Sequence, residues 1–110
     1  MRYLETNDEL ELLLGRTFLP KDAPPLPPVT VIYFTAGWCG ACRRLNMTEL
    51  EAQFPGLNWL KCDIDMNSQS AEWCDIRAIP SFVMIKNTKF IGKIQSNDNQ
   101  TVAEWIQTNL

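Results

Sequence analysis

The chain has 110 residues, of which 45% are hydrophobic and 21% are charged, and its formal net charge at neutral pH is −3. This length predicts a single domain over residues 1–110, with a core large enough to fold without metal or disulfide support. No apolar run approaches the roughly 18 residues of a membrane span, and only Arg43 and Arg44 are adjacent basic residues. We therefore expect neither membrane insertion nor binding to nucleic acid.

The absence of histidine limits the chemistry that this chain can perform. It excludes Cys-His and Ser-His catalysis and any histidine ligand to a metal, and leaves thiol, carboxylate and lysine chemistry. The five glycines form no nucleotide-binding motif. The first residues, MRYLETNDELELLLG, contain four acidic side chains and lack the pattern of a signal or transit peptide. We expect an intracellular protein of the cytoplasm or the mitochondrion.

The predicted elements begin with a short strand over residues 2–5 and a helix that one of residues 6–8 caps. This helix runs to Leu14, where Gly15 closes it. The next segment, LPKDAPPLPP at residues 19–28, holds five of the seven prolines and is predicted to be an extended loop. We interpret this loop as a rigid connector in preference to a proline-rich ligand.

A buried strand follows the loop, because VTVIYF at residues 29–34 is apolar on both faces except at Thr30. This composition is typical of a strand in the middle of a sheet. The remaining predicted elements are a helix over about 39–53 that Pro55 and Gly56 end, a strand over 57–65, a short capped helix over 67–76, a hairpin of strands 81–86 and 89–95 turning at Asn87 and Thr88, and a helix over 99–110. The alternation predicts an α/β protein with a mixed sheet flanked by helices.

Two cysteines, Cys39 and Cys42, stand directly after the buried strand in the stretch FTAGWCGACRRL. At a strand-to-helix turn, Cys39 lies at the helix N-terminus, where free N–H groups and the helix dipole stabilise a thiolate. Cys42 lies on the same face one turn deeper, within disulfide reach. This asymmetry predicts an exposed Cys39 that attacks a target disulfide and a buried Cys42 that resolves the mixed disulfide.

Other interpretations of this pair are weaker. A zinc site normally needs a second close pair, whereas Cys62 and Cys74 follow after 19 and 11 intervening residues, so no metal is expected. Inert core packing does not call for the order Trp-Cys-Gly-x-Cys at a helix start. Cys62 and Cys74 themselves are expected to be buried thiols, and the alternative for Cys74 is a regulatory thiol at the edge of the active-site surface.

The string WCGAC, residues 38–42, resembles the WCGPC active site of the thioredoxin family. Lys61 with the following DIDMN, the segment IRAIPS at 76–81 and the pair KN at 86–87 are similar to other segments of that family and occur in its order. The resemblance implies a thioredoxin fold and a protein disulfide oxidoreductase that cycles its two cysteines without a bound cofactor. It also implies two kinds of partner: protein substrates with disulfides or extended segments, and an electron-donating reductase or dithiol system.

The resemblance also implies roles for the residues around the cysteines. Pro80 is the expected cis-proline facing the first cysteine, and the backbone of Ile79 is expected to pair with an extended target segment. Trp38 is expected to cover the disulfide and to offer an apolar platform, with core packing as the alternative. Gly40 and Ala41 are expected to modulate the redox chemistry. Because Ala41 replaces the family's proline, we expect a less reducing disulfide.

Three further positions depart from the family pattern. Tyr33 stands where a buried aspartate is expected to deprotonate the resolving thiol, and a phenol with a pKa of about 10 accepts protons poorly near neutrality. Lys61 then lacks its carboxylate partner, and two placements remain open for it: beside a Cys42 thiolate, or in solvent. Thr35 stands where many members have a second tryptophan. Ser96 replaces the family's glycine in the loop after the last strand, which is expected to narrow or reshape the groove that binds targets. These departures motivate an alternative function, a redox-regulated protein-binding or chaperone-like module with little turnover.

Overall fold

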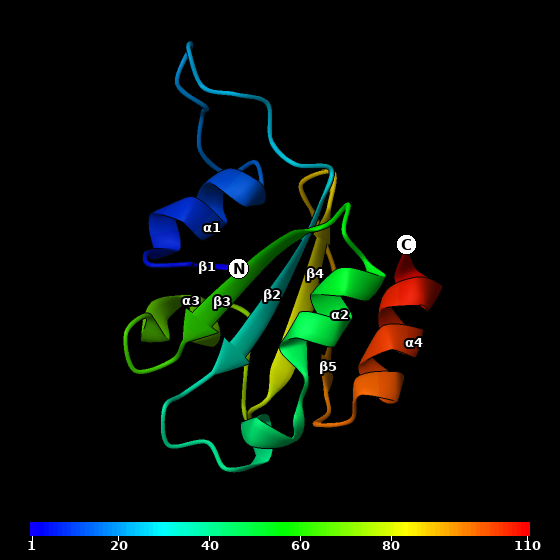
Figure 1. The fold of residues 1–110 in the computed structure, drawn as a ribbon. Helices are drawn as coiled ribbons and strands as arrows, with labels where there is room; N and C mark the ends of the chain where they lie inside the picture. The colour runs from blue at the N-terminus through cyan, green and yellow to red at the C-terminus, as the bar shows by residue number, and fades with distance from the viewer.

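The computed structural model describes all 110 residues. The chain folds into a five-stranded sheet with helices on both faces (Figure 1). The elements in chain order are β1 (Arg2–Tyr3), α1 (Asn7–Leu13), β2 (Val29–Thr35), the 3-10 helix η1 (Ala41–Arg44), α2 (Met47–Gln53), β3 (Asn58–Asp63), α3 (Ser68–Trp73), β4 (Ser81–Lys86), β5 (Lys89–Gln95) and α4 (Asn99–Asn109). This order confirms the predicted α/β class and the order of the five predicted strands.

The sheet has the strand order β1-β3-β2-β4-β5, with β2 in the middle. β2 pairs in parallel with β3 and antiparallel with β4, so the sheet is mixed. Every residue of β2 after Val29 is buried. The apolar run VTVIYF therefore forms the central strand that its composition predicts.

Alternate residues of β2 point to opposite faces of the sheet and enter two separate cores. On one face, Ile32 and Phe34 pack with residues of α1 and α3. On the other face, Val31 and Tyr33 pack with residues of α2 and α4. Figure 1 shows these two pairs of helices on the two sides of the sheet. Burying each large apolar side chain contributes roughly 1.5–3 kcal/mol, so the two cores together hold β2 in place from both faces.

The end of α1 packs against the turn between β4 and β5. Gly15 closes α1 as predicted, with a φ of +69°. A Cβ at Gly15 would lie 3.1 Å from the Cβ of Thr88, so any side chain there would meet backbone strain and a close contact together. Asn87 and Thr88 form the predicted turn with φ values of 50° and 67°. This left-handed conformation suits a two-residue hairpin turn.

The predicted helix over residues 39–53 is wrong in its first half. The structure has the short 3-10 helix η1 at Ala41–Arg44, after which Leu45 is extended, with φ −77° and ψ 138°. Asn46 then caps α2, because its side-chain oxygen accepts a hydrogen bond from a backbone N–H of the first turn at 3.1 Å. Asparagine favours such caps over helix interiors. The chain therefore restarts as a new helix, and Cys39 lies in a turn before η1.

Asn67 joins the N-terminal segment to α3 and ends β1 earlier than predicted. β1 stops at Tyr3, since the carbonyl of Leu4 accepts a hydrogen bond from the Asn67 side-chain amide at 3.2 Å. The same side chain caps α3, because its oxygen accepts from the N–H of Ser70 at 3.2 Å and its amide donates to the Ser70 hydroxyl at 2.9 Å. Asn67 is only 6% exposed, so these bonds lie out of water.

Asn67→Ala is expected to lower the free energy of unfolding by about 2–3 kcal/mol, because it removes a helix cap and leaves buried polar groups unpaired. Urea unfolding measures this loss. The matched control is Asn46→Ala, which removes the exposed cap of α2 and is expected to cost about 1 kcal/mol. Equal losses for the two variants would contradict a special contribution of the buried network.

Candidate functional site

Cys39 and Cys42 are joined as a disulfide beyond the carboxyl end of β2, with their Cα atoms 5.4 Å apart. β2 ends at Thr35, a short loop carries Cys39, and η1 carries Cys42. The sequence spacing places both sulfurs on the same side of this turn. The two cysteines predicted to form a redox pair are therefore brought together in one disulfide.

The sulfur of Cys39 accepts a hydrogen bond from the backbone N–H of Cys42 at 3.1 Å. This donor stands where the negative charge of a Cys39 thiolate would form, and it supplies the stabilisation that the sequence analysis assigned to an α-helix N-terminus. The predicted exposure of Cys39 is wrong for the disulfide state. Cys39 is 5% exposed and Cys42 is 8% exposed, because both pack into the core cluster under α2 and α4.

Gly40 and Ala41, between the cysteines, face open space. Gly40 has φ −64° and ψ −39°, a conformation that any residue adopts, and nothing lies within 4 Å of the position of an added Cβ. Ala41 is exposed and begins η1. A side chain at either position would therefore extend toward solvent beside the disulfide.

Trp38 lies on the surface next to the disulfide and is 65% exposed. Its indole N–H donates a hydrogen bond to Asp65 Oδ2 at 2.9 Å. The loop that carries Asp65 is itself ordered, because the Asp65 N–H donates to Asp63 Oδ1 at 2.9 Å. Core packing of Trp38 is thus excluded. Sequence reasoning missed Asp65, although the acidic DIDMN segment contained it.

The peptide bond between Ile79 and Pro80 is cis, as the resemblance implied. Pro80 is buried, and Ile79 packs against both cores. The N–H and carbonyl of Ile79 pair with no other backbone group. A pocket of about 270 Å³ beside this bond is lined by Trp38, Ile64, Ile76, Arg77, Ala78 and Ile79. An extended segment lying here would find an apolar surface and unpaired backbone groups.

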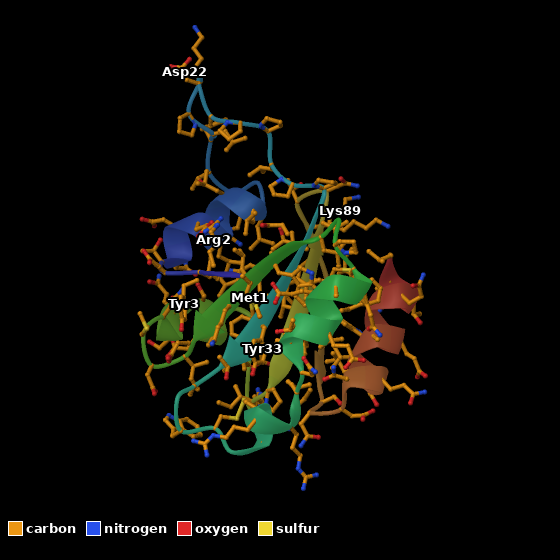
Figure 2. The ribbon with its side chains drawn as sticks, viewed as in Figure 1. Met1, Arg2, Tyr3, Asp22, Tyr33 and Lys89 are labelled. Carbon is orange, nitrogen blue, oxygen red and sulfur yellow. A yellow bond between two sulfur atoms is a disulfide. The ribbon has the colours of Figure 1, made fainter.

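Tyr33 is buried beneath the disulfide, in the same core cluster as Cys39 and Cys42 (Figure 2). Its ring stacks on that of Phe82, with the centroids 5.2 Å apart. Figure 2 shows Tyr33 in the lower half of the sheet, at the end that leads to the cysteines. The position of the family's carboxylate is therefore filled by an aromatic pair that packs against the redox site.

Lys61 is half-buried, and its ammonium lies beside the N-terminal strand β1. Its ammonium lies 5.4 Å from the centre of the Tyr3 ring, a cation–π arrangement. Strand register explains this contact, because Tyr3 and Tyr33 are the partners of Lys61 on its two sides. Lys61 also lines a small pocket with Thr35 at the start of the active-site loop. The contact between Tyr3 and Lys61 was not predicted, because it depends on β1 lying next to β3 in the sheet.

Cys62 and Cys74 lie in the other core, under α1 and α3. Burial is the main cause that raises the pKa of each thiol from 9.0 to about 12, and the charge of Asp63 raises the pKa of Cys62 further. Cys62 donates a hydrogen bond to the carbonyl of Asn67 at 3.6 Å. The predicted burial of both thiols is confirmed, and the alternative of a surface thiol at Cys74 is wrong, because Cys74 is 3% exposed.

A protein-family model described as Thioredoxin matches residues 27–108 of this chain. Mitochondrial thioredoxin-3 of Saccharomyces cerevisiae is 39% identical over 66 residues, which cover 58% of this chain and 52% of the relative. The thioredoxin of Geodia cydonium is 34% identical over 84 residues, which cover 74% of this chain and 79% of the relative. The matched part thus spans about half the length of the first relative and about four fifths of the second.

A solved structure is similar over nearly the whole chain. It comes from a study of the thiol resolving mechanism in yeast mitochondrial 1-Cys peroxiredoxin via glutathione/thioredoxin systems. The superposition has a TM-score of 0.82 at 26% identity and covers 98% of this chain and 94% of that chain. The likeness includes the segment before residue 27, which the family model does not match.

In the reduced, folded protein at pH 8, Cys62 and Cys74 are expected to resist alkylation by iodoacetamide, because burial holds their pKa near 12 and keeps them as thiols. Mass spectrometry of the peptides would measure modification over time. The control is the same reaction in denaturant, where all four cysteines should react. Equal rates for Cys74 in the folded and unfolded protein would contradict its burial.

Proposed function

This chain belongs to the thioredoxin family, and on that basis we propose that it is a protein thiol–disulfide oxidoreductase with a WCGAC active site that cycles Cys39 and Cys42 between dithiol and disulfide. The observation that carries the proposal is the disulfide beyond the central strand, with the Cys42 N–H donating to the Cys39 sulfur. The cis bond before Pro80 and the exposed Trp38 lie in the segments that the family uses for target capture.

In the reduced state, Cys39 is the attacking thiol. Its thiolate forms a bond to one sulfur of a target disulfide, and the other target sulfur leaves as a thiolate that takes up a proton. Cys42 then loses its proton and attacks the Cys39 sulfur, which breaks the mixed disulfide and releases the second target thiolate. The target gains two electrons, and the protein is left with the Cys39–Cys42 disulfide. An external dithiol donor must supply two electrons to restore the starting state.

The partners in this scheme are proteins. The unpaired backbone groups of Ile79 and the apolar pocket beside Trp38 support capture of an extended target segment by strand addition. The similar solved structure comes from work on thiol resolution in a yeast mitochondrial 1-Cys peroxiredoxin via glutathione/thioredoxin systems, which supports thiol proteins as targets of this chain. We place the protein in the cytoplasm or the mitochondrion, the latter being the location of one relative. No helix of the chain has the length and apolar character needed to cross a membrane.

A second candidate function is a redox-regulated binding or chaperone-like module. The exposed indole of Trp38 and the apolar pocket next to it favour this function, because both are suited to holding unfolded chain. Tyr33 favours it as well, since the position expected to hold a proton acceptor carries a ring stacked on Phe82. The two candidates differ in whether catalytic turnover accompanies binding.

The wild-type protein is expected to reduce insulin disulfides catalytically in the presence of dithiothreitol. Cys39→Ser should abolish both turnover and mixed-disulfide formation, because it removes the attacking sulfur, whereas Cys42→Ser should accumulate the mixed disulfide. Turbidity and non-reducing electrophoresis measure these results. The opposite behaviour of the two variants would refute the assignment. Redox-dependent suppression of aggregation without insulin reduction would support the binding module instead.

Tyr33→Asp is expected to speed the resolving step near pH 7 and to flatten its pH dependence, because a carboxylate can accept the Cys42 proton where a phenol cannot. The loss of the stacked ring should lower the free energy of unfolding by about 3–5 kcal/mol. Stopped-flow measurement of mixed-disulfide decay from pH 6 to 9 tests the first effect.

The matched control is Tyr33→Phe, which keeps the stacking on Phe82 and removes only the hydroxyl. It should leave the resolving rate unchanged across the pH range. If Tyr33→Asp is folded and its rates also equal those of the wild type, Tyr33 serves only to pack the core, and another step limits turnover.

A further inference from the structure

In the proline-rich segment at residues 23–29, which leads into β2, the burial of the side chains repeats every three residues. Ala23, Leu26 and Val29 are half-buried, whereas the pairs between them, 24–25 and 27–28, are exposed. A polyproline II helix has three residues per turn, so residues i and i+3 share one edge. The segment therefore packs one edge against the protein, and its prolines are exposed on the other two edges, where some of them border a pocket of about 290 Å³ that α1 also lines.

Local chemistry selects this conformation. A proline fixes φ near −65°, and the residue before a proline is driven out of the α region toward polyproline II. Every residue from 23 to 28 is a proline or stands directly before one. The backbone of the segment is thus restricted at each position, independently of what it contacts.

The segment is held at both ends and at its centre. The Ala23 N–H donates to the Pro20 carbonyl at 3.0 Å, and the Asn87 N–H donates to the Pro28 carbonyl at 2.8 Å. Leu26 packs against the core under α1. Between these anchors, the carbonyls of residues 24–27 accept no backbone hydrogen bond. A ligand held in its bound conformation in this way loses little entropy on binding.

Beyond the rigid connector that the sequence predicts, we propose that residues 24–28 are a docking site for a protein domain with an aromatic-lined polyproline groove, of the kind found in WW and SH3 domains. The two exposed edges consist only of prolines, Pro24 with Pro27 and Pro25 with Pro28. Such grooves hold proline rings between aromatic side chains. The unpaired carbonyls can accept hydrogen bonds from an indole N–H or a phenol O–H of the groove.

A charged side chain before the prolines further defines the partner. Lys21 stands three residues before Pro24, is exposed and forms no ion pair. An acidic side chain beside the aromatic groove would meet this ammonium, and such pairs increase specificity and the association rate more than affinity. Figure 2 shows the loop projecting from the body of the molecule, with Asp22 at its tip.

The test is a titration of the full-length, 15N-labelled protein with an unlabelled WW domain and, separately, an unlabelled SH3 domain. The proposal predicts saturable binding to at least one of them, with a dissociation constant of roughly 10⁻⁵–10⁻⁴ M, as expected of a short transient interface. Amide shifts should be confined to residues 21–29 and their neighbours. The double variant Pro24→Ala/Pro27→Ala should weaken binding at least tenfold, because it removes the rings of one exposed edge.

The matched control is Pro55→Ala, an exposed proline in the turn between α2 and β3, away from the proline segment; its affinity should stay within twofold of the wild type. If the double variant unfolds, the single variants Pro24→Ala and Pro27→Ala are titrated in its place, and each should weaken binding. Failure of both domains to bind at 1 mM, shifts located elsewhere, or unchanged affinity in the proline variants would overturn the proposal. Concentration-dependent shifts of the same amides without added domain would identify a second copy of this chain as the occupant and overturn it too.

Discussion

The burial of β2 on both faces determines where the reactive cysteines lie. A strand buried between two neighbours and two helical layers can hold a polar side chain only where that side chain is paired, as Thr30 is by the Asn58 amide, so the reactive groups lie beyond its end. The turn after β2 satisfies its backbone locally: the Cys39 N–H donates to the Ala36 carbonyl, and the Cys42 N–H donates to the Cys39 sulfur. The disulfide is therefore part of the structure that ends the central strand, which couples its redox state to the packing of the core.

Tyr33 places an uncharged aromatic side chain next to the disulfide, where the resemblance implies a buried carboxylate. A carboxylate at this position would have to remain buried beside the cysteines, and a buried charge is costly unless it is fully paired. With Tyr33 stacked on Phe82, no such charge exists, and the ammonium of Lys61 lies over the Tyr3 ring instead. The arrangement favours the stability of the sheet over a nearby proton acceptor. If Cys42 resolves a mixed disulfide as we propose, its deprotonation is expected to depend on water or on the field of Lys61.

Features set by local sequence were predictable, and features set by packing between distant segments were not. The central strand, the hairpin turn and the closing glycine of α1 follow from residue type at one or a few positions. The break in the predicted helix over 39–53 was missed because the capping preference of Asn46 outweighed the helical pattern around it. The burial of Cys39 and the contact of Lys61 with Tyr3 depend on strand order and on helix packing, which no local pattern contains.

The proline segment and the disulfide lie at opposite ends of β2 (Figure 1). A strand of seven residues extends over about 23 Å, so a domain docked on the prolines leaves the cysteines uncovered. A partner docked on the prolines is held near the cysteines without touching them. Docking then raises the effective concentration of that partner's other domains at the disulfide. Selection for a docking partner would act on the prolines, and selection for redox chemistry would act on the turn after β2. This separation allows either surface to change while the core between them stays the same.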